Sequence, residues 1–432
     1  MSRTTGPVAR SVAASERLWE RARRVIPGGT QTLSKAPSQF VDGVSPKFLQ
    51  RGKGAHVWDV DGNEYIDYPM ALGPIVLGYD YPAVSEAVIA QVRQGTTFTL
   101  MHPLEVELAE LLVELIPCAE RVRFAKNGAD ATAGAVRAAR ALTGREHVIA
   151  TGYHGYHDWY VASTSRDAGV PAANRELIHT VAFNDIRALA AALREQQVAA
   201  VVMEVPAQEP GEGYLQAAVE LAHRHGALFV LDEIVTGFRY ALGGAQELYG
   251  FTPDMACFGK GMANGYPLAA IVGREQTMRA FEEIFFSTTY AGETVSLAAA
   301  VATLGVIREQ PVLDWIWARG AELRSGIERI VAGASFGVDL VGNPPRSAID
   351  FSDADGVPSP MLRGVFLQEC HRRGVLFGVP IFPTYSHTED DVARTLHAVA
   401  AAFERMEKAY RAGELEAHLQ GRAPGVVFRS HN

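Results

Sequence analysis

Hydrophobic positions along the chain follow two alternating spacings, which predicts a sheet covered by helices. Short apolar runs of about 4–8 residues bounded by turns are typical of buried strands, and apolar residues that recur every three or four positions predict helices. Strands are predicted in this way at 122–125, 147–150, 198–203 and 228–231. Helices are predicted at 128–142, 186–196, 215–225, 297–308 and 312–331. Such alternation implies βαβ units and a mostly parallel sheet with both faces covered.

The two ends of the chain follow a more mixed pattern. A helix at 11–25 is stopped by Pro27-Gly28-Gly29, and a hairpin at 53–68 turns at Asp61-Gly62-Asn63. The remaining predictions are helices at 83–92, 104–115, 360–372 and 390–411 and a strand near 348–351. The tail beyond about residue 419 is weakly patterned, and we expect it to be mobile. We therefore predict an α/β fold with a large domain at 71–310 and a smaller α+β domain built from 1–70 and 311–432.

Composition narrows the class of protein. With 432 residues, of which 48% are hydrophobic, the chain can bury a large core. The net charge of −9 and the lack of a basic block argue against a nucleic-acid partner. The first residues, Met1 to Gly6, open no apolar signal segment, and no run of about 18 apolar residues predicts a membrane span. Cys118, Cys257 and Cys370 show no paired spacing, so we expect no disulfide framework, no metal site and a reducing, cytoplasmic location.

Lys260 and Asp232 form the most informative pair of residues. Asp232 ends the apolar run Leu228-Phe229-Val230-Leu231, and Lys260 lies in a later glycine-rich loop, Gly259-Lys260-Gly261. Pyridoxal phosphate (PLP) needs an amine to form a Schiff base and an acid to keep its ring nitrogen protonated. Taken alone, Lys260 could be a surface lysine, and Asp232 a helix cap or a metal ligand. An ATPase interpretation of the acidic strand end fails, because no glycine-rich phosphate loop of the P-loop type precedes it.

Three further segments carry polar or aromatic groups. Asn127-Gly128-Ala129-Asp130 falls at a strand-to-helix junction, where free backbone N–H groups and the helix dipole favour phosphate, and an ordinary N-cap by Asn127 is compatible with that role. The loop Tyr153-His154-Gly155-Tyr156-His157-Asp158-Trp159 suits a lined pocket better than a core aromatic cluster. Thr288-Thr289-Tyr290-Ala291-Gly292 precedes a helix and, by itself, is best explained as a capping motif.

With these residues in view, the chain resembles a class III aminotransferase of PLP fold type I, in the subgroup that includes glutamate-1-semialdehyde 2,1-aminomutase. The resemblance covers almost the whole chain, and its motifs together are highly specific. They are Ile26-Pro27-Gly28-Gly29, the segment 58–67, Tyr153-His154-Gly155, the segment 232–239, the loop of Lys260, and Ser386-His387-Thr388-Glu389-Asp390.

The resemblance implies a role for each matching residue. Lys260 would bind PLP through a Schiff base and move a proton between substrate carbon and cofactor carbon, and Asp232 would pair with the pyridine nitrogen. Tyr153 and Ile234 would lie on the two faces of the ring. The other cofactor contacts implied are Asn127, Gly128, Ala129, His154, the strand-end acid Glu204 and, in a homodimer with shared active sites, Thr289 at the phosphate of the other copy.

Several departures from the family pattern bear on the substrate. Asn127-Gly128-Ala129 replaces the usual Ser-Gly-Thr and removes one hydroxyl contact, and Val235 stands where many aminotransferases have Gln. The segment 377–384 lacks the acid of the aminomutase, which counts against aminomutase activity. It also lacks an Arg that would clamp a carboxylate, which counts against a simple keto acid as acceptor. Lys35 remains as a residue that would receive a donor carboxylate.

The leading functional hypothesis is transamination from an amino-acid donor such as glutamate to a ketone or aldehyde. We expect an oxo-sugar or aminoglycoside-type acceptor, as in amino-sugar biosynthesis, because His157, Asp158 and Trp159 suit hydrogen bonding and stacking with a polyhydroxylated ring. The alternatives are a PLP-dependent isomerase, either an aminomutase or a racemase, and a PLP-binding protein without catalytic activity. In each case the expected ligands are small molecules.

Overall fold

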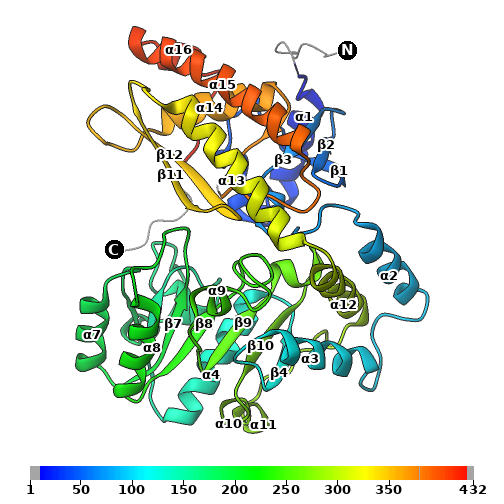
Figure 1. The fold of residues 1–432 in the computed structure, drawn as a ribbon, viewed down its shortest axis with the longest axis vertical. Helices are drawn as coiled ribbons and strands as arrows, with labels where there is room; N and C mark the ends of the chain where they lie inside the picture. The colour runs from blue at the N-terminus through cyan, green and yellow to red at the C-terminus, as the bar shows by residue number, and fades with distance from the viewer. Residues whose placement is uncertain (1–9, 379, 426–432) are drawn as a thin grey trace. The chain divides into compact units, whose positions relative to one another are not determined.

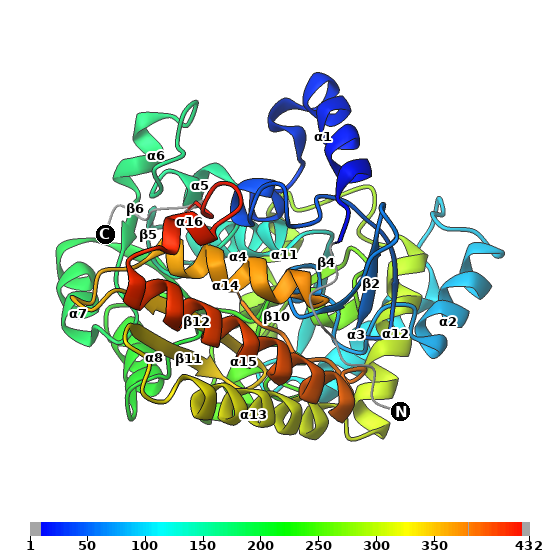
Figure 2. The same ribbon diagram turned by 90° about the horizontal axis from the view of Figure 1, so that it is seen from above.

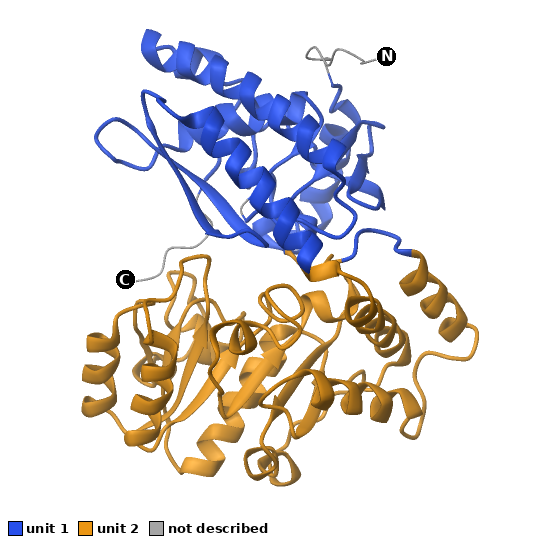
Figure 3. Ribbon diagram, in the orientation of Figure 1, with its two compact units in different colours: residues 1–72, 77–81, 314–427 blue, residues 73–76, 82–313, 428–432 orange. Residues whose placement is uncertain are grey.

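The structure is a computed structural model that describes residues 10–378 and 380–425 (Figure 1). The described residues form two compact units (Figure 3). Unit 1 contains the residues up to 72, 77–81 and those from 314 onward, and unit 2 contains 73–76 and 82–313. The N-terminal segment Met1 to Gly6 and the part of the predicted mobile tail at 426–432 lie outside the described residues. The domain assignment made from the sequence stays a prediction.

Unit 2 is built on a seven-stranded sheet in the order β4-β10-β9-β8-β7-β5-β6 (Figure 1). The strands are β4 (Arg121–Ala125), β5 (His147–Thr151), β6 (Ile178–Thr180), β7 (Val198–Glu204), β8 (Leu228–Asp232), β9 (Met255–Phe258) and β10 (Ala269–Gly273). Strand β10 runs antiparallel to both of its neighbours, β4 and β9. The other four pairings in this sheet are parallel. The prediction of an α/β fold with a mostly parallel sheet is therefore confirmed.

The helices of unit 2 pack on this sheet and on one another. They are α2 (Pro82–Val92), α3 (Pro103–Leu115), α4 (Gly128–Thr143), α5 (Asp158–Val161), α6 (Ala172–Glu176), α7 (Ile186–Glu195), α8 (Tyr214–Arg224), α9 (Ala245–Tyr249), α10 (Glu275–Met278), α11 (Ala280–Glu283) and α12 (Thr294–Glu309). Helix α4 contacts β4 and β7–β10. Its small residues allow this close approach, since a Cβ atom on Gly134 would come within 2.7 Å of Ile271 Cδ1. Helix α12 packs against α2 and α3.

Unit 1 combines a four-stranded sheet, a separate hairpin and long helices. The sheet has the order β1-β2-β3-β13, and β11 pairs with β12. These strands are β1 (Leu49–Lys53), β2 (His56–Asp59), β3 (Glu64–Asp67), β11 (Gly337–Asn343), β12 (Arg346–Ser352) and β13 (Val375–Leu376). The helices are α1 (Ala13–Val25), most of α13 (Val312–Val331), α14 (Pro360–Arg372), α15 (Glu389–Ala412) and α16 (Leu415–His418). Figure 2 shows α14 lying beside α15, and both helices contribute to one apolar core.

Six strands and several helices of four or five residues were not predicted by the sequence pattern. Strands β6, β9, β10, β11 and β13 were not recognised, and neither was β1. Every residue of β9 and of β10 is buried, so neither strand shows the alternation of a half-exposed strand. A buried run of four or five residues cannot be told from other buried segments by its periodicity.

The described residues also set limits on other kinds of site. Among them, no helix is long and apolar enough to span a bilayer, and no cluster of three or more His, Cys, Asp or Glu side chains could bind a metal ion. All three cysteines are buried free thiols. Burial raises the pKa of the Cys118 thiol to about 12, so this thiol is protonated and unreactive near neutral pH.

Candidate active site

The residues singled out in the sequence gather at the carboxyl edge of the sheet in unit 2. Asp232 is the last residue of β8, and the strand register places it beside Glu204 of β7 and Cys257 of β9. Lys260 follows the end of β9 and opens the short 3-10 helix η5 (Lys260–Ala263). Open α/β sheets bind their ligands at this edge. The fold therefore brings the predicted acid and amine to neighbouring strand ends.

Two more of the predicted segments leave the sheet at the same edge. Because β10 is antiparallel to both β4 and β9, strand β4 runs parallel to β9, and Asn127 follows its carboxyl end. The aromatic loop that contains Tyr153 and His154 follows β5, whose last residue, Thr151, is paired with Met203 of β7. Four loops separated in sequence thus start from one edge.

Asp232 is only 3% exposed, but its carboxylate can accept further hydrogen bonds. Oδ1 accepts the backbone N–H of Ile234 at 3.0 Å, and Oδ2 lies 2.8 Å from Nδ1 of His154. Each carboxylate oxygen carries two lone pairs, so each can accept one further donor. A buried carboxylate whose oxygens can accept further hydrogen bonds can pair with a cationic N–H group of a ligand.

His154 contacts the carboxylate of Asp232. The imidazole is buried, with Nδ1 at Asp232 Oδ2 and Nε2 at 3.1 Å from the backbone oxygen of Thr151. A carbonyl oxygen only accepts, so Nε2 donates and the contact between Nδ1 and Oδ2 must contain a proton of its own. The ring also lies nearly parallel to Trp159, with an interplanar angle of 18°. The structure places this predicted cofactor contact next to the acid.

Glycines allow the four loops to approach one another closely. A Cβ atom on Gly128 would lie 2.9 Å from Ile234 Cδ1, and one on Gly259 would lie 3.1 Å from the same atom. A Cβ atom on Gly155 would lie 2.5 Å from the Cβ of Ala129. Ile234 therefore sits between the turn that opens α4 and the residue that precedes Lys260. An aliphatic side chain in this place can cover one face of a flat ring.

The N-terminus of α4 has the features of an anion site. Asp130 Oδ2 accepts the backbone N–H of Asn127 at 2.8 Å, which closes the capping box. The N–H groups of Gly128 and Ala129 come first in a helix of 16 residues, where the dipole favours negative charge. His157 Nε2 lies 3.2 Å from Asp130 Oδ1. This predicted substrate residue thus contacts the capping acid.

Glu233 shows what a buried acid with a structural role looks like. It directly follows Asp232, and its carboxylate accepts the backbone N–H groups of Ala245 (2.9 Å) and Gln246 (3.0 Å) at the start of α9. The Thr236 hydroxyl also donates to it. Burial raises the pKa of Glu233 to about 7. Its acceptors are used to fix the loop that follows Asp232.

Tyr153 is exposed at the carboxyl edge and contacts the buried Glu204. The backbone N–H of Tyr153 donates to Glu204 Oε2 at 3.1 Å, while the Tyr153 residue is 53% exposed. Partial burial, followed by the charges of Asp232 and Glu204, raises the pKa of the Tyr153 hydroxyl. Glu204 thus orients the start of the aromatic loop, and the ring of Tyr153 remains accessible to a ligand.

The remaining predicted residues lie in different surroundings. Lys35 is exposed at the end of a 3-10 helix (Leu33–Lys35) in unit 1. Trp159 is 9% exposed and belongs to the apolar core of unit 2, which favours the core interpretation of its ring. Asp158 is exposed at the start of α5, and Thr289 is exposed in the segment before α12. The substrate and partner roles of these residues stay predictions.

Arg239 and Asn264 lie in segments that the sequence singled out, but the sequence assigned neither residue a role. Arg239 is fully buried and donates to backbone oxygens of 73–76, and Asn264 accepts the backbone N–H of Val76. Both contacts join residues far apart in the sequence. The one local signal is the place of Asn264 in a glycine-rich loop, where a positive φ is common. Its φ is 45°.

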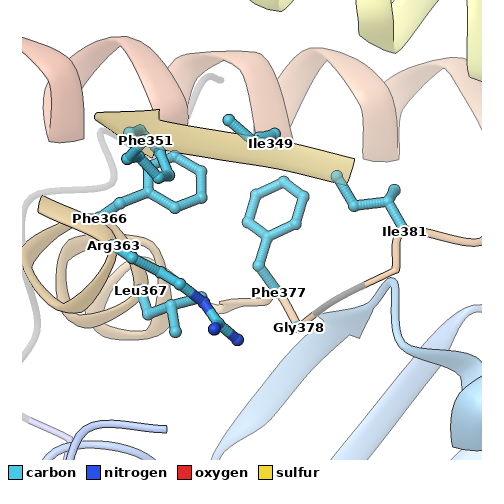
Figure 4. A pocket seen from close by; sticks show the side chains of 8 residues that line it. All are labelled: Ile349, Phe351, Arg363, Phe366, Leu367, Phe377, Gly378 and Ile381. Atoms are coloured by element: carbon cyan, nitrogen blue, oxygen red, sulfur yellow. The ribbon is translucent and has the colours of Figure 1, made fainter. Parts of the chain in front are cut away.

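A small pocket in unit 1 has a different character. Figure 4 shows mainly aromatic and aliphatic side chains from β12, α14 and the segment after β13 around it. Its one charged residue is Arg363, and burial lowers the pKa of this guanidinium. The pocket is lined by no carboxylate and no lysine. It therefore offers none of the groups that the predicted chemistry requires.

The carboxyl edge fits PLP on its own geometry. The acid with unspent acceptors suits a pyridinium N–H, and the first turn of α4 suits a phosphate. Ile234 provides an apolar face, and its contacts with Gly128 and Gly259 leave room for no larger residue at either position. Lys260 supplies the amine beside this arrangement. The residues present match the ring nitrogen, ring face, phosphate and aldehyde of the cofactor.

Comparison with known proteins points the same way. The sequence model of the aminotransferase class-III family matches residues 41–403. A 3-aminobutyryl-CoA aminotransferase of Cloacimonas acidaminovorans is 36% identical, over 92% of this chain and 98% of its own. A glutamate-1-semialdehyde 2,1-aminomutase of Methanothrix thermoacetophila is 35% identical, over 89% of this chain and 92% of its own. The PLP internal aldimine form of the FumI protein from Sphingopyxis sp. MTA144 has a TM-score of 0.87 and 31% identity, covering 96% of this chain and 99% of its own.

Proposed function

The chain belongs to the class III aminotransferases and is a PLP-dependent transaminase, and from this premise we propose that it moves amino groups between an amino acid such as glutamate and a second substrate whose reacting carbon is not adjacent to a free carboxylate. One observation supports the proposed position of the amino transfer at the carboxyl edge. The buried Asp232 carboxylate retains free acceptor positions at the strand end beside the one that leads to Lys260.

Each residue of the carboxyl edge has a role in this proposal. PLP, when bound, supplies an electron-accepting ring on which an amino group can be exchanged. Asp232 accepts the pyridinium N–H, and His154, within hydrogen-bonding distance of Oδ2, holds Asp232 in place. The first N–H groups of α4 bind the phosphate. Lys260 Nζ bears the cofactor between turnovers and moves the proton at the substrate carbon during them.

The substrate class rests on what the relatives and this chain have in common. In 3-aminobutyryl-CoA the amine is one carbon further from the acyl group than in an α-amino acid. In glutamate-1-semialdehyde the aldehyde carbon lies at the other end of the molecule from the free carboxylate. The sequence 377–388 contains no arginine that could clamp a carboxylate bidentately. These three facts support a substrate whose reacting carbon carries no neighbouring carboxylate.

An oxo-sugar acceptor remains one member of this class. Its ring carbonyl has no adjacent carboxylate, and its hydroxyl groups would find hydrogen-bonding partners in His157, which contacts Asp130 at the start of α4, and in the exposed Asp158. The burial of Trp159 removes the stacking surface that first suggested a sugar. Glutamate stays the proposed donor for such an acceptor.

A half-reaction screen tests the proposal. Purified, PLP-saturated protein is mixed with single amines, and conversion of the cofactor to its pyridoxamine form is followed by the loss of visible absorption. Besides the amino-acid donor, at least one amine of the proposed class (a β-amino acyl thioester, a terminal amine or an amino sugar) should convert the cofactor. Conversion only by α-amino acids, with return only by 2-oxo acids, would refute the proposed substrate class. Borohydride reduction and peptide mass spectrometry should place the trapped adduct on Lys260.

An aminomutase is the second candidate, because the 35% identical relative carries that name. Such an enzyme would isomerise glutamate-1-semialdehyde to 5-aminolevulinate without any second substrate. The absence of an acid in 377–384 argues against this activity. Incubation of the pyridoxamine form with glutamate-1-semialdehyde alone separates the two candidates, since a transaminase stops after one turnover.

We also propose that the protein acts as a homodimer. Unit 2 exposes large apolar side chains on α2, α3, the segment between them and the segment before α12. They are Ile89, Val92, Phe98, Leu100, Met101, Val106, Val113, Phe285 and Tyr290. Exposed apolar surface can mark interaction sites, and the exposed Thr289 also lies in the segment before α12. Sedimentation of a Leu100→Asp, Met101→Asp variant should reveal a monomer, whereas an unchanged dimer would move the interface elsewhere.

A further inference from the structure

A four-residue segment is tied to the Lys260 loop from far away in the sequence. Gly73–Val76 belongs to unit 2, although the residues on both sides of it belong to unit 1. Arg239 Nη2 donates to the backbone oxygens of Gly73 (3.1 Å) and Ile75 (3.2 Å). The backbone N–H of Val76 donates to Asn264 Oδ1 at 2.9 Å. Three hydrogen bonds therefore hold the 73–76 segment in unit 2.

The arginine that makes two of these bonds is buried at a cost. Arg239 is 1% exposed and is one of the largest fully buried side chains of the described chain. A buried guanidinium is unfavourable unless its N–H groups are paired. Arg239 also ends the stretch that begins at Asp232, directly after Phe238, whose φ is 56°. One side chain thus connects the loop of the acid to the 73–76 segment.

The 73–76 segment in turn packs on the residues that follow Lys260. A Cβ atom on Gly265 would lie 2.6 Å from Ile75 Cδ1. A Cβ atom on Gly261 would lie 3.4 Å from the backbone oxygen of Gly237 and 3.9 Å from the Cβ of Val76. The loop after Lys260 is therefore enclosed by the 73–76 segment and by the residues just before Arg239.

The enclosed loop has a backbone that needs support. Lys260 has φ of 38° and Asn264 has φ of 45°, both in the left-handed region. Side-chain-bearing residues persist there only where the surrounding structure holds them. The chain also enters the 73–76 segment through three left-handed residues, Met70–Leu72, with φ of 42°, 56° and 76°. Left-handed residues therefore lie both before the 73–76 segment and in the Lys260 loop. The hydrogen bonds between these two parts help to hold their backbones in that conformation.

We propose that Arg239 is a positioning residue for Lys260, acting through the 73–76 segment and Asn264. By fixing this segment, Arg239 keeps the Lys260 backbone in its left-handed conformation, and so fixes the origin of the side chain that carries the amine. The inference rests on the proposed role of Lys260. It assigns no contact between Arg239 and substrate or cofactor.

A matched pair of variants tests the inference on PLP-saturated, full-length protein. Arg239→Lys replaces a guanidinium that bonds two backbone oxygens at the carboxyl edge. Arg145→Lys does the same at the opposite edge, where Arg145 Nη1 donates to the oxygens of Val198 (3.0 Å) and His225 (2.7 Å). Amide hydrogen exchange of the 73–76 segment is measured together with the single-turnover rate at increasing donor concentration.

The expected results separate positioning from general stability. Arg239→Lys should speed exchange in the 73–76 segment and lower the limiting single-turnover rate constant by about tenfold, the effect of one charged hydrogen bond, without changing the apparent donor affinity. Arg145→Lys should leave both readouts at the wild-type values. Faster exchange with an unchanged rate constant would overturn the inference, and so would an unchanged exchange rate.

A second pair covers the case in which Arg239→Lys does not fold. Asn264→Gly keeps the left-handed conformation but removes the acceptor for Val76, and Asn264→Asp restores an acceptor. The limiting rate constant should fall in Asn264→Gly and recover in Asn264→Asp. Equal rate constants in these two variants would overturn the inference. A wild-type protein without a borohydride-trapped adduct on Lys260 would instead refute the proposed function itself.

Discussion

The two edges of the seven-stranded sheet are formed by the same strands, but their polar side chains are hydrogen-bonded differently. At the amino edge, Arg145 bonds two backbone oxygens, and Asp254 accepts the backbone N–H of Phe229 (2.7 Å) and Nε2 of His223 (2.8 Å). At the carboxyl edge, Asp232 retains acceptor positions, and Lys260 adopts a left-handed backbone. The polar groups named at the amino edge bond to other parts of the protein. At the carboxyl edge, polar groups remain that can bind a ligand.

Removing the amine tests the comparison most severely. Lys260→Ala should lower the rate of cofactor conversion by amines by at least about 10⁴-fold, because it removes both the covalent attachment and the proton-transfer group. Exposed Lys408 on α15 provides the control, and Lys408→Ala should keep the wild-type rate. Stopped-flow absorbance measures both variants, and substantial conversion by Lys260→Ala would place the chemistry elsewhere.

The two aspartates provide the second test. Asp232→Asn should lower the limiting rate about 10²–10³-fold, the range for one preorganised electrostatic partner, with a modest change in stability. Asp254→Asn should reduce the free energy of unfolding, because Asp254 anchors the start of β8, and should leave the limiting rate near wild type. Urea titration and single-turnover kinetics of both variants decide the matter. Similar kinetic losses in the two variants would erase the distinction between the edges.

Glu233 sharpens the comparison, since it lies at the carboxyl edge but serves structure. Its pKa is raised by burial from 4.5 to about 7. The folded protein therefore keeps a proton that the unfolded chain has already lost. As a result, the free energy of unfolding decreases as pH rises between these two values, by up to about 3 kcal/mol, and levels off above them.

Glu233→Gln removes this titration. The variant should be less stable overall, because its amide nitrogen cannot accept from the start of α9, but its stability should fall less between pH 5 and pH 8. Burial also raises the pKa of Asp67 to about 6, and this contribution cancels because both proteins contain Asp67. Urea unfolding at several pH values measures the two slopes. Parallel slopes would show that Glu233 does not titrate in this range.

The two ends of α4 give the smallest expected effect. Gly128→Ala places a methyl group 2.9 Å from Ile234 Cδ1, and overpacking of this kind costs about 1–2 kcal/mol. We expect PLP to be released roughly tenfold faster, as measured by fluorescence after dilution. Gly144→Ala, at the left-handed end of the same helix (φ 67°), has open space around it and should reduce stability alone. Equal PLP release from both variants would contradict a cofactor role for Gly128.

Periodicity predicted the long elements because their boundaries carry local signals. The helix predicted at 360–372 is α14, which begins with Ser359 as N-cap and a proline in its first turn. The strand predicted at 228–231 is β8, one residue longer at Asp232. Strands β9 and β10 were missed because they are buried on both sides and short. The antiparallel direction of β10 also has no signal in the sequence.

The candidate site could be located from the sequence, but its supports could not. Lys260, Asp232 and the turn at Gly128 are recognisable because loop glycines and strand-end acids are local features. Arg239 lies in the segment 232–239 that carries the resemblance, but no role was assigned to it from the sequence, and only the fold places 73–76 against it. His154 reads as a pocket residue, and only the strand register brings it to Asp232. Contacts between distant loops depend on the whole sheet, and no short motif encodes them.

The division of unit 1 between the two ends of the chain has a consequence for biosynthesis. Strand β3 leaves the ribosome early, but β13, with which it pairs in parallel, is made only after all of unit 2. At about 5–20 residues per second, the nascent hairpin exposes an unpaired edge for roughly 15–60 s. A message truncated anywhere before residue 375 would leave that edge without its partner, so premature termination should yield aggregates and not a smaller enzyme.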